Sequence, residues 1–227
     1  MKIKAILFGS TGMLGQAVLF ECIENTEVES ILAINRQAYN ISHPKLKEII
    51  RKDLFDLSGL TDEMTGYNTC FFCLGVSSAG MKEDEYHKIT YDLTLNVATT
   101  LLAINKEMTF CYISGAGTDS SEKGRIMWAK VKGKTENALL SAPFKKAYMF
   151  RPGFIQPMKG IRSRTKTYNV LYSIFKPFYF ILKHFDSIVT NTEVFGKAMI
   201  LTVLNGYEKN ILENSDINRI VRDNKEL

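Results

Sequence analysis

The sequence predicts an α/β fold, a doubly wound parallel sheet with a small C-terminal helical substrate region. Apolar runs of strand length alternate with longer helical segments between residues 2 and 151, which is typical of parallel strands joined by crossover helices. The run at 69–74 (TCFFCL) is almost continuously apolar, as expected for a strand buried on both faces. A glycine-rich turn separates the first strand-like run from the first helical one.

The expected elements follow one another in a regular order. We expect strands at 2–8, 30–35, 46–52, 69–74, 108–113 and 146–151, and helices at 12–24, 83–104, 125–141, 192–205 and 215–223. No internal repeat or clean linker divides the chain, so we expect one domain over 1–227. Its first part, 1–155, is the expected dinucleotide-binding core, and 156–227 is the expected substrate or lid elaboration.

Composition excludes several classes of protein. The chain has 227 residues, of which 45% are hydrophobic and 23% charged, so disorder and coiled coil are excluded. The formal net charge of +5 is thinly spread, with no basic and aromatic stripe, so we expect no nucleic-acid partner. The sequence also lacks a Gly-x-Ser-x-Gly nucleophile elbow, which argues against a hydrolase of that type.

The four cysteines are Cys22, Cys70, Cys73 and Cys111. They form no dense framework and no apolar leader precedes the first strand, so we expect reduced thiols and a cytoplasmic location. Cys70 and Cys73 resemble a metal or redox pair. Residues three apart on a strand point to opposite faces, however, so we expect buried structural cysteines and no metal site.

The turn after the first strand carries Gly9, Gly12 and Gly15 at three-residue spacing. Gly9 permits a tight turn, Gly12 permits close approach of a pyrophosphate, and Gly15 permits the helix to pack on the sheet. The start of the helix offers free N–H groups to phosphates, and Ser10 and Thr11 add hydroxyl donors. This pattern predicts a dinucleotide-binding turn.

The residues after the second expected strand select the cofactor. Asn35 and Arg36 stand where an NAD site usually has an acid for the ribose 2′-hydroxyl. A guanidinium suits a 2′-phosphate instead, so we expect NADP(H), with NAD(H) as the alternative.

Further motifs carry a resemblance to a known family. They are the Gly-x-x-Gly-x-x-Gly turn, Cys73-Leu74-Gly75 after the fourth strand, Ser114 after the fifth, and Val131-Lys132-Gly133-Lys134-Thr135-Glu136 on the next helix. Together they resemble the atypical short-chain dehydrogenases/reductases, which are NAD(P)-binding Rossmann proteins. The most similar branch contains the Tat-interacting oxidoreductases, some of which are called nucleotide-sugar epimerases.

The resemblance implies catalytic roles. Ser114 would steady the substrate oxygen and Lys132 would hold the nicotinamide ribose. The family's proton-transferring Tyr belongs four residues before Lys132, where this sequence has Trp128. An indole does not titrate usefully. Tyr91, Tyr86 or a water held by Ser114 are therefore alternatives, as is chemistry without a Tyr.

The resemblance also implies cofactor contacts beyond the turn. Asp53 would lie near the adenine, Gly75 near a ribose, and Pro152 and Gly153 near the nicotinamide. The full expected cofactor set is Gly9, Ser10, Thr11, Gly12, Met13, Leu14, Gly15, Arg36, Asp53, Leu54, Leu74, Gly75, Lys132, Pro152 and Gly153.

The segment 168–185 is rich in aromatic and aliphatic residues but is interrupted by Lys176 and Pro177. Lid or core packing, a membrane-surface segment, an apolar substrate pocket and a homodimer interface are its alternatives. The sequence thus predicts an NADP(H)-dependent oxidoreductase acting on a small molecule, or a catalytically silent NADP(H)-binding regulatory or partner-binding protein.

Overall fold

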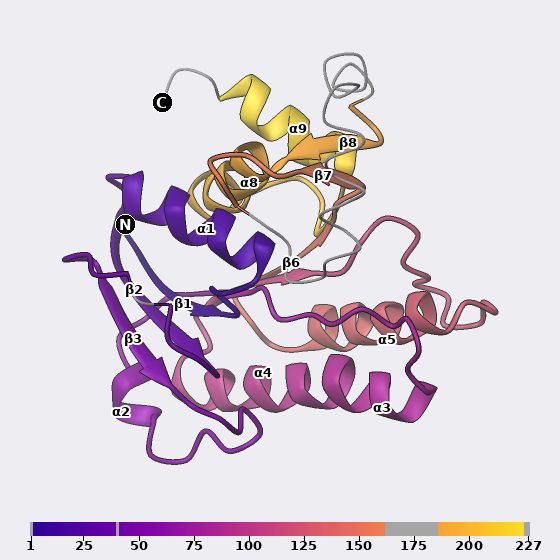
Figure 1. Cartoon of the computed structure of the whole chain (residues 1–227), viewed down its shortest axis with the longest axis horizontal. Helices are drawn as coiled ribbons and strands as arrows, with labels where there is room; N and C mark the ends of the chain where they lie inside the picture. Colours follow the sequence, from indigo (N-terminus) through magenta and orange to yellow (C-terminus); the bar gives the residue numbers. More distant parts are fainter. Residues whose placement is uncertain (1, 40, 162–185, 225–227) are drawn as a thin grey trace.

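A seven-stranded parallel sheet forms the centre of the molecule (Figure 1). The computed structural model describes residues 2–39, 41–161 and 186–224. The sheet consists of β1 (Ile3–Phe8), β2 (Val28–Asn35), β3 (Leu46–Ile50), β4 (Thr69–Phe72), β5 (Thr109–Ile113), β6 (Lys146–Arg151) and β9 (Ile211–Glu213). Their spatial order is β3-β2-β1-β4-β5-β6-β9, and all six neighbouring pairs are parallel. The α/β doubly wound prediction is confirmed.

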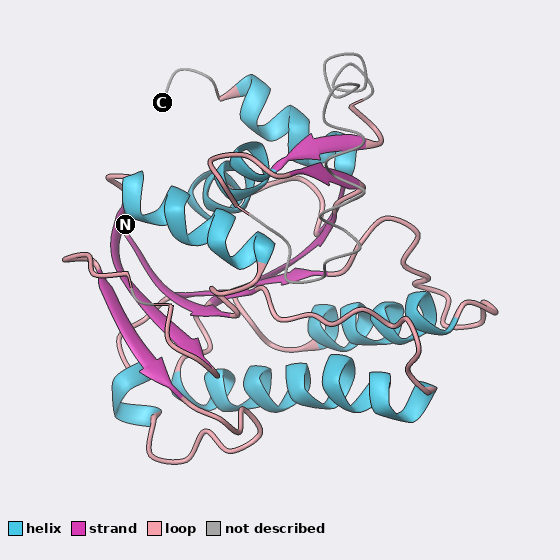
Figure 2. Cartoon of the chain, viewed as in Figure 1, coloured by secondary structure: helices cyan, strands magenta, loops and turns pink. Residues whose placement is uncertain are grey.

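Helices cover both faces of this sheet (Figure 2). One face carries α1 (Met13–Glu24), α8 (Thr192–Asn205) and α9 (Asn214–Asp223). The other carries α2 (Thr61–Met64), α3 (Glu83–His87), the π-turn η1 (Lys88–Asp92), α4 (Leu93–Ile104) and α5 (Met127–Ser141). Successive side chains of β1 point to opposite faces of the sheet. Ala5 and Leu7 pack in the hydrophobic core under α1 and α8, and Ile6 and Phe8 pack in the core under α4.

The strand order reverses between β1 and β4. From β1 the chain winds outward to β2 and β3, then returns across the sheet to β4 on the other side of β1. Ligands of open α/β sheets bind outside the carboxyl ends of the strands at such a reversal. The glycine-rich turn between β1 and α1 lies at this edge.

Some elements differ from the sequence prediction. The expected helix at 83–104 is a continuous helical run, but η1 inserts a π-turn into it. Three short strands were not predicted: β9, and the parallel pair β7 (Phe154–Gln156) and β8 (Val189–Asn191). Three-residue strands carry no periodicity, and only their partners define them. The short helix α2 was not predicted either.

The C-terminal helices form where expected, with α8 and α9 close to the predicted 192–205 and 215–223. The predicted apolar segment 168–185 lies outside the described residues. No helix in the described ranges is both long and apolar enough to span a membrane.

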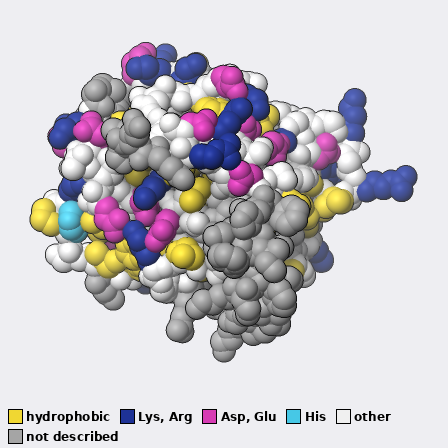
Figure 3. All heavy atoms as spheres, turned by 90° about the horizontal axis from the view of Figure 1, so that it is seen from above, with side chains coloured by type: hydrophobic (Ala, Val, Ile, Leu, Met, Phe, Trp, Pro, Cys, Tyr) yellow, Lys and Arg dark blue, Asp and Glu magenta, His cyan; other side chains and the backbone are white. Residues whose placement is uncertain are grey.

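Acidic and basic side chains are intermixed on the side of the molecule that carries α1, α8 and α9 (Figure 3). Lys159 lies 2.9 Å from Glu24, Arg219 lies 3.0 Å from Glu208, and Arg222 lies 2.6 Å from Asp186 on N–O distances. Exposed pairs of this kind contribute little to stability, ~0–1 kcal/mol each.

We expect replacement of Gly196 to destabilise the fold. A Cβ at Gly196 on α8 would lie 2.8 Å from the Ala17 carbonyl oxygen and 2.7 Å from Glu21 Cγ, so α8 would have to move away from α1. Overpacking of this kind costs about 1–3 kcal/mol. Denaturant unfolding of Gly196→Ala measures it, with Gly75→Ala as the control because its Cβ would meet no atom within 4 Å. Equal losses in the two variants would contradict the prediction.

Candidate functional site

The turn between β1 and α1 is closely packed against the sheet. Gly9 has φ +82°, and a Cβ there would lie 3.0 Å from the Cys73 backbone. A Cβ at Gly15 would lie only 2.0 Å from the Gly9 carbonyl oxygen. Both positions therefore require glycine, and the predicted structural roles of Gly9 in the turn and Gly15 in helix packing are confirmed.

The amino end of α1 has unused donors. Gly12 is its N-cap and supplies no side-chain cap, and its first turn contains no acidic residue. Gln16 N donates to the Gly12 carbonyl at 2.8 Å, which begins the helical ladder. The first-turn N–H groups of Met13, Leu14 and Gly15 precede that ladder, and together with the helix dipole they suit an anion.

Space is also available at this edge. A Cβ at Gly12 would meet only the Gly9 carbonyl oxygen, at 3.4 Å, and one at Gly75 would meet nothing within 4 Å. Leu74, half-buried, lies beside Gly9 and walls the turn on the β4 side. At Gly12 and Gly75 there is thus room for a ligand to approach the protein backbone closely.

Ser10 forms a hydrogen bond within the fold. It is fully buried, and its Oγ accepts a hydrogen bond from Asn35 Nδ2 at 2.6 Å. Its hydroxyl oxygen therefore joins the turn to the end of β2. The expected donation to a phosphate stays a prediction, since a hydroxyl that accepts one hydrogen bond can still donate one. Thr11 is half-buried in the same turn.

A carboxylate that the sequence analysis did not predict lies beside the end of β2. Glu48 on β3 accepts hydrogen bonds from Asn35 Nδ2 at 2.7 Å and from the Tyr39 N–H at 3.0 Å. The parallel register pairs Glu48 with Ala33, two residues before Asn35, so both side chains share a sheet face. Asn35 Oδ1 is buried and has no hydrogen-bond partner among the described residues. Arg36 is exposed beside this cluster.

The residues after β3 divide between surface and core. Asp53 is exposed, and its Oδ1 accepts from the Phe55 N–H at 2.9 Å, which stabilises the turn. Leu54 is buried in the core beneath α4. Its side chain therefore packs in the interior, and the expected contact of Leu54 with a cofactor stays a prediction.

Ser114 and Lys132 come together at the end of β5. Ser114 Oγ donates to the Glu136 carboxylate and also lies 3.2 Å from the Phe150 carbonyl oxygen, and the residue is only 5% exposed. Its hydroxyl is directed into the interior, and the expected role of steadying a substrate oxygen stays a prediction. Lys132 Nζ donates to the Ser114 carbonyl oxygen at the carboxyl end of β5.

Trp128 lies one helical turn before Lys132 on α5 and is half-buried. Its ring packs near Gly117, where an added Cβ would lie 3.6 Å from the Trp128 Cη2 atom. The loop after β5 is thus held against α5 by an indole, in the position where the resemblance implies a phenol.

A buried ion pair supports this corner of the fold. Glu136 is fully buried, and its two carboxylate oxygens accept from Arg151 Nε at 3.0 Å and Nη2 at 2.5 Å. Arg151 also lies 3.1 Å from Glu213 on β9. Burial lowers the pKa of Lys132 to about 8, and the nearby Glu136 carboxylate offsets part of that decrease.

Of the two alternative tyrosines, Tyr86 lies buried and Tyr91 contacts side chains other than Lys132. Tyr86 is 2% exposed, and burial raises the pKa of its phenol. Tyr91 stacks 4.7 Å from His87, with Lys134 Nζ 4.7 Å from its ring centroid. Lys134 is two residues beyond Lys132, and positions two apart on a helix do not share a face.

The exit of β6 is filled by the chain itself. A Cβ at Gly153 would lie 2.2 Å from the Ile188 carbonyl oxygen, and Gly153 N donates to Asn214 Oδ1 at 2.9 Å. Pro152 is buried, and its carbonyl oxygen accepts from the Ala116 N–H at 2.9 Å. Gly153 thus permits close approach of the residue before β8, and the expected cofactor contact of Pro152 and Gly153 stays a prediction.

The cysteines lie in the core, as expected for structural thiols. Cys22, Cys70 and Cys111 are fully buried free thiols, and Cys73 is half-buried at the end of β4. Burial raises the pKa of all four thiols.

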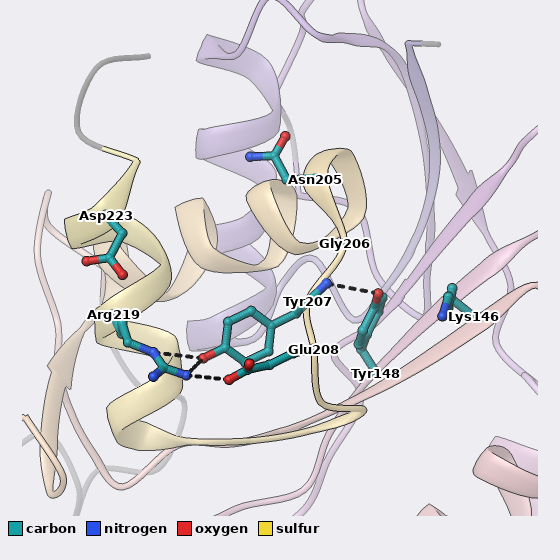
Figure 4. Close-up of a pocket in the computed structure, with 8 residues that line it drawn as sticks. All are labelled: Lys146, Tyr148, Asn205, Gly206, Tyr207, Glu208, Arg219 and Asp223. Atoms are coloured by element: carbon teal, nitrogen blue, oxygen red, sulfur yellow. Dashed lines mark hydrogen bonds and ion pairs between the residues drawn. The ribbon is translucent and has the colours of Figure 1, made fainter.

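A cavity of about 600 Å³ lies at the opposite edge of the sheet (Figure 4). Its lining consists of Lys146, Tyr148, Asn205, Gly206, Tyr207, Glu208, Arg219 and Asp223. Lys146 begins β6, so this cavity is at the amino ends of the strands and contains no predicted site residue.

Comparison with known proteins places the chain among proteins of one fold. No protein-family model matches it. Protein FMP52, mitochondrial, of Meyerozyma guilliermondii is 27% identical over 154 residues, which is 67% of this chain and 65% of that protein. The protein of the same name from Eremothecium gossypii is 28% identical over 153 residues, with 66% of each chain covered. The matched part therefore spans just under two thirds of these relatives.

Solved structures share the whole fold at low identity. The ADP-L-glycero-D-manno-heptose-6-epimerase of Helicobacter pylori has a TM-score of 0.67 and 14% identity, covering 99% of this chain and 82% of that one. A short chain dehydrogenase family protein from Francisella tularensis has a TM-score of 0.63 and 11% identity, covering 91% and 93%. These likenesses show that this chain has the Rossmann-like fold of epimerase and short-chain dehydrogenase structures.

The expected cytoplasmic location is contradicted by the comparisons. Several relatives found from the sequence carry the word mitochondrial in their names. The expectation depended on the cysteine content and the start of the sequence, and neither observation distinguishes between two reducing compartments.

We expect loss of either partner of the Glu136–Arg151 pair to be strongly destabilising. Arg151→Met leaves a buried carboxylate without its cation, which costs about 3–5 kcal/mol of unfolding free energy. Denaturant unfolding measures it, and the exposed pair Lys47–Glu63 supplies the control Lys47→Met, which should cost under ~1 kcal/mol. The double variant Glu136→Gln with Arg151→Met should recover part of the loss, and strict additivity would contradict the pairing.

Proposed function

We propose that this protein binds a nicotinamide dinucleotide at the carboxyl edge of its sheet and uses it for redox chemistry on a small molecule. The observation that supports this most is the β1–α1 turn, in which an uncapped helix start meets open space at Gly12 and Gly75. Phosphates bind such helix starts through backbone N–H groups. The epimerase and short-chain dehydrogenase neighbours share the fold that positions this turn.

The residues present fit such a cofactor. Met13 N, Leu14 N and Gly15 N would hold the pyrophosphate, and Asp53 and Arg36 stand at the exposed edge on the β2–β3 side. Lys132 Nζ, at the end of β5, would lie on the nicotinamide side. A bound nicotinamide supplies two-electron exchange with a substrate carbon.

We propose NADP(H) as the preferred form. Arg36 is an exposed guanidinium with a geometry suited to phosphate, and β2 itself ends in an amide. Glu48 is the one feature that opposes a 2′-phosphate, but its carboxylate already accepts from Asn35 and from Tyr39 N. NAD(H) remains the competing form, and the Glu48 charge is what would favour it.

A second function is supported by Trp128. The position that would carry a titrating phenol holds an indole, and Ser114 is directed away from the site. A protein that binds NADP(H) and does not turn it over, as a regulatory or partner-binding protein, is consistent with both observations. Such a protein would bind NADPH but would not oxidise it with any of a panel of aldehydes and quinones.

Replacement of Gly12 should abolish dinucleotide binding with little effect on folding. The Gly12→Val side chain would occupy the space in front of the first turn of α1, while its Cβ meets only one atom at 3.4 Å. Calorimetry with NADPH and NADH should show at least a tenfold loss of affinity. Thermal unfolding is the control: Gly12→Val should melt close to the native protein, because Gly12 has φ −84° and needs no glycine for its backbone conformation. Native-like affinity in Gly12→Val would refute the proposed site.

Charge changes at the end of β2 should alter the ratio of NADPH affinity to NADH affinity. Arg36→Glu should weaken NADPH relative to NADH by more than tenfold, because it replaces an attraction to the 2′-phosphate with a repulsion. Glu48→Gln keeps an acceptor for Asn35 and removes the charge, so it should strengthen NADPH relative to NADH. Calorimetric affinities at low and high salt measure both effects. An unchanged NADPH-to-NADH ratio in both variants would assign the 2′ position elsewhere.

A further inference from the structure

The proposed function needs a group that exchanges a proton with the substrate oxygen, and the groups expected for this task are all committed elsewhere. The Ser114 hydroxyl donates to Glu136, Tyr86 is buried, and Tyr91 contacts His87 and Lys134. Trp128 has no proton to exchange near neutral pH.

Lys132 is placed differently from these groups. Its Nζ contacts the Ser114 backbone carbonyl, so the ammonium lies at the carboxyl end of β5, at the sheet edge where the glycine-rich turn also lies. A backbone carbonyl accepts one hydrogen bond from Nζ and leaves the other donors of the ammonium free. Trp128 lies one turn earlier on the same face of α5 and is half-buried.

We propose that Lys132 is itself the proton donor and acceptor of this site, in place of the missing phenol. This inference rests on the proposed function. In the reductive direction, a bound reduced nicotinamide would supply a hydride to the carbonyl carbon of the substrate, and the Lys132 ammonium would give its proton to the carbonyl oxygen. A proton from solvent would then restore the ammonium, so one carbonyl, one reduced nicotinamide and one proton would become one alcohol and one oxidised nicotinamide.

The electrostatic surroundings of Lys132 support this role. Desolvation lowers the pKa of Lys132 to about 8, close enough to neutral pH for the amine to give up and regain a proton. The charged groups that face it are the buried Glu136 on α5 and, behind Glu136, Arg151 on β6. Because Arg151 pairs with Glu136 through two hydrogen bonds, that carboxylate is already neutralised in large part and does not hold the Lys132 proton as a free carboxylate would.

The first measurement concerns the native protein without a substrate. Trace acetylation of lysine amines with acetic anhydride between pH 6 and 11, read by peptide mass spectrometry, gives the pH midpoint of each amine. Lys132 should reach half of its maximal reactivity near pH 8, before Lys134 on the exposed side of the same helix. A Lys132 midpoint at or above that of Lys134 would overturn the proposal.

The second measurement separates proton transfer from binding. Lys132→Arg keeps the cation but holds its proton too tightly to transfer it. With NADPH and the quinone probe 9,10-phenanthrenequinone, this variant should lose at least 100-fold in single-turnover rate yet bind NADPH within about threefold of the native affinity. Adding Trp128→Tyr to Lys132→Arg should restore a large part of the rate, because a phenol then stands one turn away. Lys134→Arg is the matched control and should change neither quantity.

The outcomes distinguish the two proposals. Loss of NADPH binding in the native protein refutes the proposed function. Native binding with a Lys132→Arg rate and pH profile equal to those of the native protein overturns the Lys132 assignment alone. Native NADPH binding with the quinone left unreduced also overturns it, and supports the silent binding protein.

Discussion

The close approach of α1 to the end of β1 is the constraint on which the rest of the site depends. Gly15 allows the helix backbone to contact the Gly9 carbonyl, and Gly9 in turn adopts a positive φ against the backbone of Cys73. With these contacts the amino end of α1 is held at the point where the strand order reverses. The donors of its first turn then face the sheet edge without a side-chain cap, and this is the physical basis for binding an anionic ligand there.

Two buried polar clusters hold the edges of this site in place. Ser10, Asn35 and Glu48 connect the turn to β2 and β3, whereas Ser114, Glu136 and Arg151 connect β5, α5 and β6. In both clusters a serine that the sequence predicted to contact a ligand forms hydrogen bonds within the fold. Burial of the Glu136 carboxylate is tolerated because Arg151 approaches it through two nitrogens, and removal of either charge would leave the other desolvated and alone.

The same arrangement explains why the chemistry of the site is unusual. A hydroxyl that already donates its proton inside the protein must give up that hydrogen bond before it can donate to a ligand. The hydroxyl of Ser114 is satisfied, and the phenols of Tyr86 and Tyr91 lie elsewhere, whereas the Lys132 ammonium lies at the sheet edge with donors to spare. The hydrogen-bond network around β5 therefore decides which groups can act on a ligand. Residue type alone does not reveal this.

The alternation of strands and helices, the two sheet faces and the glycine requirements at Gly9 and Gly15 were all predictable from the sequence, because they follow from local periodicity and from backbone sterics within one short segment. The three-residue strands β7, β8 and β9 were not, since nothing but a partner strand defines them. Helix spacing also placed Trp128 one turn before Lys132, because that spacing is local, whereas the family resemblance alone implied that Ser114 lies near them. Only the tertiary structure decided that Glu48 lies beside Asn35, that Glu136 takes the Ser114 hydroxyl, and that Gly153 makes room for Ile188. Each of these contacts joins elements that are far apart in sequence or on different strands, and its geometry depends on strand register and helix rotation that no local pattern encodes.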